Sequence, residues 1–377
     1  MKTTKDRLFY KECNRKRYNP MENNKTVLVT GGCGFIGANF IHLVNRVRPD
    51  WRVVNLDKLT YAGNLKNLEG IQQGETYRFV KGDIGDAVLV AQLFLEENIN
   101  TVVHFAAESH VDRSISGPAD FIQTNIIGTF NLLEASRSCW LGQDKTIELP
   151  LFLHVSTDEV YGSLGETGYF SETTSYDPRS PYSASKASSD HLASAYFHTY
   201  DLPVIITNCS NNYGPYQFPE KLIPLVFHNS MIGRELPVYG DGKNVRDWLY
   251  VTDHCEALVA VIEQGKPGKS YNIGGNNEKQ NIEVVQLICD TLDEKIGLLE
   301  GGHPRQSLIR YVTDRLGHDR RYAIDASLIK EDIGWQPSVS FETGIKRTID
   351  WFLSHQEWMS SVIDGSYREY YRKMYGT

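Results

Sequence analysis

The stretch KTVLVTGGCGFIG, residues 25–37, decides the fold of this chain. Its first six residues have the composition of a short buried strand, and a helical pattern follows over residues 38–47. Between the two lie Gly31, Gly34 and Gly37, spaced three residues apart. In such a junction the first glycine permits a tight turn, the second lets a pyrophosphate approach the backbone, and the third lets the helix pack on the strand. The stretch therefore predicts a dinucleotide-binding site, with a purely structural glycine turn as the alternative.

The cofactor expected at this site is NAD. A second strand, residues 52–57, ends in Asp57, twenty residues after Gly37. A carboxylate at this place can bond both ribose hydroxyls and would repel the 2′-phosphate of NADP. Asp83 closes a third strand and is expected to meet the adenine. The free N–H groups at the start of the following helix suit the pyrophosphate.

The alternation of strand and helix continues as far as residue 207. Strand patterns recur at 77–80, 101–107, 151–155 and 202–207, and helical patterns at 87–97, 121–137 and 182–200. This alternation predicts an α/β fold with a doubly wound parallel sheet of the Rossmann type. Turn formers and aromatic residues then dominate residues 211–224, which is typical of a binding loop.

Two lobes are expected, because 377 residues exceed what one hydrophobic core usually supports. Residues 25–207 and about 245–265 are predicted to form the NAD-binding domain. Residues 208–244 and 266–377, with approximate boundaries, are predicted to form a smaller C-terminal α/β lobe that binds the substrate. The cleft between the lobes is then the expected ligand site. Residues 1–24 are basic and lack apolar periodicity, so a flexible extension is expected there.

Composition excludes several classes of function. The net charge of −8 argues against non-specific binding of nucleic acid, which needs a basic surface. No apolar run approaches the ~20 residues of a membrane span. The six cysteines are scattered and form no CxxC pair, so neither a zinc site nor a disulfide framework is expected. Free thiols of this kind favour a cytoplasmic protein without a metal.

A second stretch, STDEVYG at residues 156–162, contains groups suited to proton transfer. It follows an apolar strand, and open α/β sheets place their reacting groups at the carboxyl ends of parallel strands. Asp158 and Glu159 can supply a proton donor and a proton acceptor side by side. Tyr182 and Lys186 follow at one-turn helical spacing. Together these residues predict a reaction that moves protons and a hydride.

Many further motifs occur in order along the chain. They are TGGCGFIG (30–37), LDKLTYAGN (56–64), GDI (82–84), HFAAESHVDRSI (104–115), STDEVYG (156–162), YSASK (182–186), NCSNNYGPYQFPEKLIP (208–224), RDWLYV (246–251) and DRLGHDRRYAID (314–325). This set resembles the extended short-chain dehydrogenase/reductase superfamily and, within it, closely resembles the dTDP-glucose 4,6-dehydratase family. Cys33 and Leu316 depart from residues that the family often has, and neither position carries chemistry.

The resemblance implies a lyase that converts dTDP-glucose to dTDP-4-keto-6-deoxyglucose and water, with NAD reduced and then reoxidised in the site. It implies that Tyr182 takes the proton of the sugar O4 and that Lys186 favours the phenolate by its charge. Thr157 is expected to hold the O4 hydroxyl. Glu159 is expected to remove the C5 proton, and Asp158 to protonate the departing C6 hydroxyl.

The resemblance also implies the binding residues. For the cofactor they are Gly31, Gly34, Phe35, Ile36, Gly37, Asp57, Asp83, Ile84, Ala106, Tyr182 and Lys186. For the nucleotide-sugar they are Glu108, Thr157, Asn211, Lys221, Arg246, Asn281, Arg315 and His318. Arginine suits a diphosphate because its planar guanidinium makes paired, charge-assisted hydrogen bonds.

Two alternatives stay open at this point. One is another nucleotide-sugar enzyme of the same fold, such as a 4-epimerase or a UDP-glucuronate decarboxylase. An epimerase needs no acid–base pair to expel water, so Asp158 and Glu159 favour a dehydratase. The other is a non-catalytic NAD-binding protein, which would tolerate loss of these acids. A homodimer is expected, formed through the helices at 121–137 and 182–200.

Overall fold

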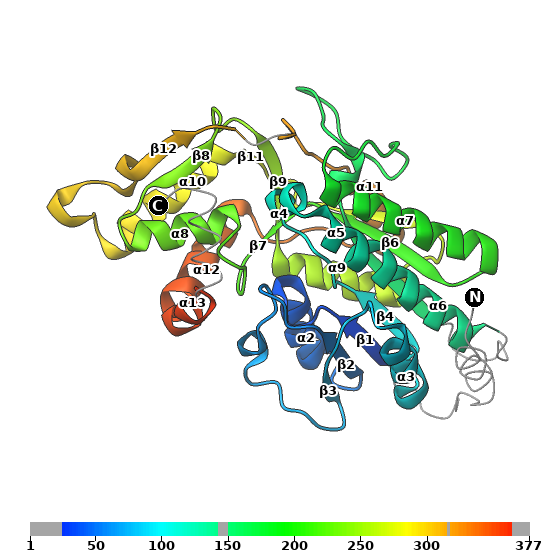
Figure 1. Ribbon diagram of the computed structural model, residues 1–377. Helices are drawn as coiled ribbons and strands as arrows, with labels where there is room; N and C mark the ends of the chain where they lie inside the picture. Colours follow the sequence, from blue (N-terminus) through cyan, green and yellow to red (C-terminus); the bar gives the residue numbers. More distant parts are fainter. Residues whose placement is uncertain (1–24, 142–149, 315–316, 364–377) are drawn as a thin grey trace.

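The large sheet of the molecule has seven parallel strands in the order β10-β6-β5-β4-β1-β2-β3 (Figure 1). The structure, a computed structural model, describes residues 25–141, 150–314 and 317–363. The strands are β1 (Thr26–Thr30), β2 (Arg52–Asp57), β3 (Tyr77–Lys81), β4 (Thr101–His104), β5 (Leu151–Thr157), β6 (Val204–Cys209) and β10 (Ser270–Ile273). The strand order reverses at β1, which pairs with both β2 and β4. The predicted doubly wound Rossmann sheet is therefore confirmed.

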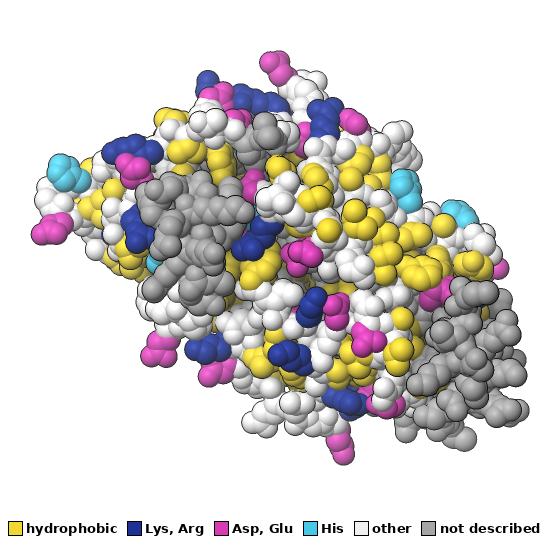
Figure 2. Space-filling model, in the orientation of Figure 1, with side chains coloured by type: hydrophobic (Ala, Val, Ile, Leu, Met, Phe, Trp, Pro, Cys, Tyr) yellow, Lys and Arg dark blue, Asp and Glu magenta, His cyan; other side chains and the backbone are white. Residues whose placement is uncertain are grey.

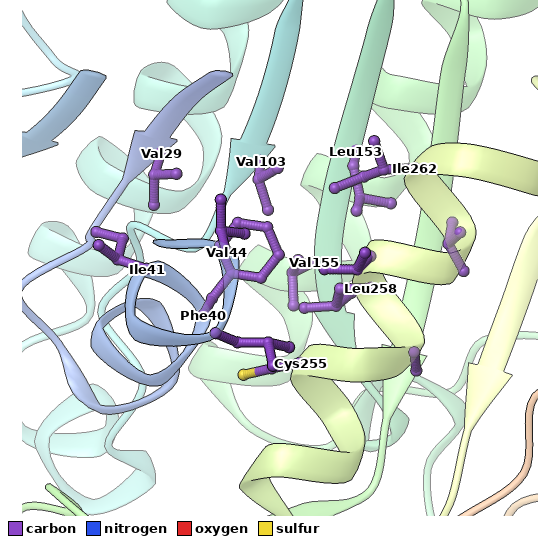
Figure 3. Packing of buried hydrophobic residues seen from close by; sticks show 14 of the residues in the cluster. Val29, Phe40, Ile41, Val44, Val103, Leu153, Val155, Cys255, Leu258 and Ile262 are labelled. Carbon is purple, nitrogen blue, oxygen red and sulfur yellow. The ribbon is translucent and has the colours of Figure 1, made fainter. Parts of the chain in front are cut away.

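Helices cover both faces of this sheet. On one face α2 (Phe35–Val47) packs beside α9 (Val251–Gln264), and Val29, Phe40 and Leu258 belong to the core beneath them (Figure 3). The other face is covered by α3 (Ala87–Glu97), α6 (Thr129–Trp140) and α7 (Pro181–Tyr200). Both faces of the strands are buried, which explains why their sequences are continuously apolar.

The helical pattern at 121–137 is interrupted in the structure. It comprises α5 (Pro118–Phe121), a π-helical segment at Ile122–Gly128 and then α6, and α4 (Val111–Ser116) precedes it. Within the π-helical segment, the Asn125 side chain bonds the backbone of Glu108 and the Ser185 hydroxyl. Helical periodicity alone does not distinguish an α-helix from such a π-helical bulge, because both place apolar residues on one face.

A smaller lobe lies beside the large sheet (Figure 1). Its strands are β7 (Asn211–Tyr213), β9 (Val245–Tyr250) and β11 (Glu278–Gln280) in one sheet, and β8 (Leu236–Tyr239) and β12 (Ile309–Val312) in another. Its helices are α8 (Leu222–Met231), α10 (Asn281–Ile296), α12 (Phe341–Ser354) and α13 (Gln356–Val362). The fully buried side chains of Tyr213, Phe227 and Phe352 lie in its core.

The predicted domain boundaries need two corrections. Residues 266–377 are not all part of the smaller lobe, because β10 pairs with β6 at the edge of the large sheet and Ile329 of α11 (Ser327–Ile333) lies in the core beneath α9. Residues 245–265 are also divided, since β9 belongs to the smaller lobe's three-stranded sheet and α9 to the large one. Short strands such as these carry no local signal of their partner, so the sequence pattern misplaced them. Residues 1–24, the predicted extension, lie outside the described residues.

Within the described ranges, no helix combines the length and the apolar character that a membrane span requires.

The glycine junction shows why helix α2 can approach β1 so closely. Gly31 has φ +71°, and a Cβ there would lie 2.8 Å from the backbone of Ala106. A Cβ on Gly37 would lie 2.4 Å from the Gly31 carbonyl oxygen, a distance at which backbone has to move. The two glycines therefore hold the turn and the helix against each other, as the spacing predicts.

Gly37→Ala is expected to destabilise the protein and weaken its NAD binding, because the added methyl group pushes α2 away from the Gly31 turn. Overpacking of this kind costs about 1–3 kcal/mol. Urea denaturation and NAD titration of the purified protein measure both effects. Gly74→Ala is the matched control, since a Cβ there meets nothing within 4 Å. Equal stability and NAD affinity in the two variants would contradict this account of the junction.

Candidate active site

A cleft of about 450 Å³ lies between the lobes, along the carboxyl ends of the large sheet's strands. Every predicted site residue within the described part of the chain lines it. These residues are Gly31, Gly34, Phe35, Ile36, Gly37, Asp57, Asp83, Ile84, Ala106, Glu108, Thr157, Asp158, Glu159, Tyr182, Lys186, Asn211, Lys221, Arg246, Asn281 and His318. Arg315 lies outside the described residues.

The dinucleotide end of the cleft is built from the glycine junction and Asp57. Gly34 is the N-cap of α2, no side chain caps this helix, and its first turn holds no acidic residue. The start of α2 is therefore suited to an anion. Because a side chain at Gly31 would fill space against Ala106, the missing Cβ keeps the backbone open. These features fit the pyrophosphate of NAD.

Asp57 is held in place by the backbone around it. Its Oδ2 accepts a hydrogen bond from Cys33 N at 2.8 Å, and its Oδ1 accepts one from Leu59 N at 2.7 Å. Burial nevertheless raises the pKa of Asp57 above its ordinary value. A carboxylate has about four lone-pair sites, so both oxygens retain capacity for ribose hydroxyls. The geometry fits the predicted ribose contact.

Asp83 has a partner that the sequence pattern did not indicate. It forms an ion pair with Lys58 Nζ at 2.7 Å, and its Oδ1 accepts a hydrogen bond from Gly85 N, also at 2.7 Å. Burial acts to raise the pKa of Asp83, but these two interactions outweigh it and lower the pKa. Asp83 therefore stays charged at the edge of the cleft, beside Ile84. Its contact with adenine stays a prediction.

Tyr182 and Lys186 lie in the first turns of α7. Ser180 caps this helix in a capping box with Ser183, which fixes where the helix begins. Lys186 Nζ donates a hydrogen bond to the Val155 carbonyl at 2.9 Å and so ties α7 to β5. Burial, followed by the nearby charge of Glu159, raises the pKa of Tyr182 well above its ordinary value. The predicted lowering of this pKa by Lys186 stays a prediction.

The two acids follow the end of β5. Thr157 Oγ1 accepts a hydrogen bond from Glu159 N and donates one to Asp158 Oδ1, both at 3.3 Å. Asp158 is 2% exposed, and its Oδ2 has no hydrogen-bond partner among the described residues. Burial, then the charges of Glu159 and Asp247, raise the pKa of Asp158 well above its ordinary value. The environment therefore favours a protonated Asp158 beside a second carboxyl group, an arrangement that suits an acid and a base.

The opposite wall of the cleft comes from the smaller lobe. Arg246 is buried, donates to the Asp319 carbonyl at 2.9 Å and lies 4.3 Å from the centre of the Tyr322 ring. The Asn211 Oδ1 atom is buried without a hydrogen-bond partner among the described residues. His318 Nδ1 lies 2.5 Å from an Asp314 carboxyl oxygen. This wall therefore offers a cation, an amide and an aromatic ring to a ligand.

Asn281, Glu108 and Lys221 complete the predicted set. Asn281 begins α10, and its backbone N–H bonds the Asn244 carbonyl. Burial raises the pKa of the Glu108 carboxyl group. Lys221 Nζ donates to the Ser109 carbonyl at 3.1 Å, which joins the loop before α8 to the large lobe.

Glu220 and Trp248 are among the cleft residues that the sequence analysis did not name as site residues. Glu220 is buried and accepts hydrogen bonds from Tyr61 Oη and Arg113 Nε, both at 3.3 Å. Trp248 Nε1 is a buried donor without a hydrogen-bond partner in the described ranges. Trp248 could have been predicted to lie in the cleft, because it follows the predicted site residue Arg246 by two positions. For Glu220 the sequence showed only an acidic residue within a loop rich in aromatic residues, which does not by itself predict a place in the cleft.

Comparisons with known proteins agree with this geometry. A family model described as GDP-mannose 4,6 dehydratase matches residues 28–348. A dTDP-glucose 4,6-dehydratase of Xanthomonas campestris pv. campestris (strain B100) is 61% identical over 344 residues, which cover 91% of this chain and 97% of that protein. The chain belongs to the dTDP-glucose 4,6-dehydratase family.

Solved structures of this family and of its neighbours share the fold. The dTDP-glucose 4,6-dehydratase of Streptomyces venezuelae, solved with NAD and TYD bound, is 44% identical with a TM-score of 0.81 and covers 89% of this chain and 99% of that one. A UDP-glucose 4-epimerase of Thermotoga maritima, solved with UDP-glucose, is 29% identical with a TM-score of 0.76 and covers 88% of this chain and 99% of that one. The fold alone therefore does not separate dehydratases from epimerases.

Proposed function

We propose that this protein is a lyase that converts dTDP-glucose to dTDP-4-keto-6-deoxyglucose and water with a tightly held NAD. The observation that carries the proposal is Asp158, a buried acid with a raised pKa that lies beside Glu159 in the same cleft as Tyr182 and Lys186. Membership in the dTDP-glucose 4,6-dehydratase family supports the choice of substrate. The 4-keto product is suited to later steps that make deoxysugars such as rhamnose.

The first step is oxidation at C4 of the sugar. When bound, NAD would supply the acceptor for the hydride that leaves C4 and, in its reduced form, the donor of the hydride that returns to C6. Tyr182 takes the proton of the O4 hydroxyl, which Thr157 holds by a hydrogen bond. Because the pKa of Tyr182 is raised by burial and Glu159, the tyrosine needs a nearby positive charge to act as a base at neutral pH. Lys186, one helical turn away, is placed to supply it.

The next step is the loss of water, which the two acids carry out. A ketone at C4 acidifies the C5 proton, and Glu159 removes that proton. Asp158 protonates the C6 hydroxyl as it departs, because hydroxide is a poor leaving group. The raised pKa of Asp158 keeps the proton available for this transfer. An epimerase or a decarboxylase of this fold has no need for such an acid, so Asp158 favours dehydration over both alternatives.

The smaller lobe holds the nucleotide in this proposal. Arg246 pairs with the diphosphate, and Asn211, Asn281 and His318 bond phosphate or sugar oxygens. Lys221 and Glu108 act at the junction of the lobes, and Arg315 joins the diphosphate contacts. Arg315 lies outside the described residues, and the others line the cleft, which supports a substrate that spans the two lobes.

A cytoplasmic location is also part of this proposal. The five cysteines among the described residues, Cys33, Cys139, Cys209, Cys255 and Cys289, are buried and free. Unpaired thiols of this kind are typical of a reducing compartment.

Direct turnover tests the proposed function. Purified protein incubated with dTDP-glucose is expected to give a product lighter by one water, with a keto group at C4. UDP-glucose and GDP-mannose serve as comparison substrates and are expected to react much more slowly. A product of unchanged mass would indicate an epimerase, and loss of carbon dioxide from a UDP-glucuronate control would indicate a decarboxylase.

Asp158→Asn is expected to lower turnover of dTDP-glucose by about 10²–10⁴-fold, the usual contribution of a general acid. Fluoride departs without protonation, so dTDP-6-fluoro-6-deoxyglucose is expected to restore turnover by the variant. The measurement compares wild type and variant on both substrates. An equal loss on both substrates would show that Asp158 does not act as the acid.

A homodimer is expected, formed through α6, α7 and the π-helical segment between α5 and α6. Ile122, Ile127 and Phe130 are 53%, 40% and 41% exposed there, and hydrophobic side chains gather over this region of the surface (Figure 2). Light scattering should give twice 42.8 kDa at micromolar concentration. Phe130→Glu should shift the mass towards the monomer, whereas Leu298→Glu, at an exposed residue of the other lobe, should not. A monomeric wild type would contradict the expectation.

A further inference from the structure

A buried polar network lies beneath the catalytic end of the cleft. Asp190 of α7 is at its centre and is 1% exposed, while His154 and Ser156 of β5 are 0% and 4% exposed. Lys186 precedes Asp190 by four residues, so the two side chains lie on the same face of α7. Asp190 itself does not line the cleft, and nothing in the proposed reaction uses it.

The Asp190 carboxylate joins several elements. His154 Nε2 lies 3.0 Å from its Oδ1. Its Oδ2 accepts hydrogen bonds from the Ser156 hydroxyl at 2.8 Å and the Tyr176 hydroxyl at 3.0 Å. Asn208 Nδ2 of β6 lies 3.4 Å from the same oxygen and also donates to the Thr157 carbonyl at 3.2 Å. Strands β5 and β6 and the loop before α7 thus meet at this one carboxylate.

The contacts between α7 and β5 fall on consecutive residues of the strand. Lys186 bonds the Val155 carbonyl, and Asp190 bonds the Ser156 hydroxyl. The next residue of the strand is Thr157, which is followed by the two acids. A shift of Ser156 therefore moves Thr157 and the acids relative to Tyr182, which lies on α7.

Asp190 is the acid whose negative charge acts on Lys186. Burial lowers the pKa of Lys186, and the charges of Asp190 and Cys209 act to raise it. His154 and Lys186 help to hold the pKa of Asp190 below its ordinary value although burial acts to raise it. Burial lowers the pKa of His154, which therefore tends to stay neutral.

The remaining titratable groups that face this network come from other elements. His104 of β4 is buried with a pKa well below its ordinary value, so it stays uncharged. Burial raises the pKa values of Tyr161, Tyr176 and Cys209, and these groups stay protonated near neutral pH. Asp190 thus provides the nearby negative charge that can keep Lys186 protonated.

We propose that Asp190 is a positioning residue for the proposed dehydration: its carboxylate keeps Lys186 protonated beside Tyr182 and fixes, through Ser156, the strand end that carries Thr157, Asp158 and Glu159. This inference rests on the proposed function only in that one of its tests measures the activity of the enzyme. The ammonium then favours the Tyr182 phenolate, and the Ser156 bond sets the distance between that base and the two acids.

Asp190→Asn tests the charge, and Tyr176→Phe is the matched control because it removes a hydrogen bond to the same oxygen and leaves the charge. In Asp190→Asn the basic limb of the activity–pH profile should move to lower pH, because an opposite charge that raises the pKa of Lys186 is gone. Its acidic limb should stay in place, because Lys186 is still protonated at that lower pH and keeps its charge beside Tyr182. Turnover at neutral pH should fall at least tenfold, with little change in KM. Tyr176→Phe should leave both limbs in place.

A second variant and a second measurement keep the test decisive. Asp190→Glu retains the charge and should retain the wild-type profile, although its turnover falls. Nitrogen NMR of lysine-labelled protein, with the Lys186 signal assigned from Lys186→Met, measures protonation of Lys186 without substrate. That measurement separates failure of this inference from failure of the proposed function. A uniform loss of activity at every pH in Asp190→Asn, or a neutral Lys186 in the folded wild type at neutral pH, would overturn the proposal.

Discussion

The parallel register of β1, β4, β5 and β6 is the constraint on which the rest of the structure depends. It places Thr30 opposite His104, and His104 opposite His154, so β1 and β4 end at the same level, while β5 and β6 continue together to Thr157 and Cys209. The Gly31 turn, the loop after β4 and the acids after β5 consequently open into one cleft. A cofactor cradle and a proton-transfer site that are more than a hundred residues apart in sequence thereby become neighbours.

Burial then gives chemically similar groups different properties. Asp57 and Asp158 are both buried and both have raised pKa values, but two backbone N–H groups bind Asp57, whereas one oxygen of Asp158 has no hydrogen-bond partner among the described residues. The first environment suits a carboxylate that accepts hydrogen bonds, and the second suits an acid that gives up a proton. Asp190, another buried acid, has a lowered pKa because His154, Lys186 and Ser156 outweigh the effect of burial. These acids are all aspartates, so their different roles come from their positions in the fold and not from their residue type.

Much of the site was predictable from sequence because its residues lie in short local patterns. The glycine spacing, Asp57 at a strand end and the Tyr182–Lys186 pair all reach the cleft as the patterns predict. What sequence did not reveal depends on contacts between distant segments. The pairing of β10 with β6, the ion pair of Asp83 with Lys58 and the bonds of Asp190 to β5 and β6 each join parts of the chain that no local pattern connects. Residues such as Ser156 are ordinary in sequence and acquire significance only through these contacts.

The central claim is that one cleft removes hydrogen from C4 of the sugar and returns it to C6 of the same molecule. Turnover of a mixture of dTDP-[4-²H]glucose and ¹³C-labelled dTDP-glucose in ordinary water tests it directly. Mass spectrometry and NMR of the products are predicted to show deuterium at C6 only in molecules without ¹³C, with one solvent proton at C5. Deuterium lost to water, deuterium in the ¹³C-labelled product, or reduced cofactor accumulating in step with product would contradict the account.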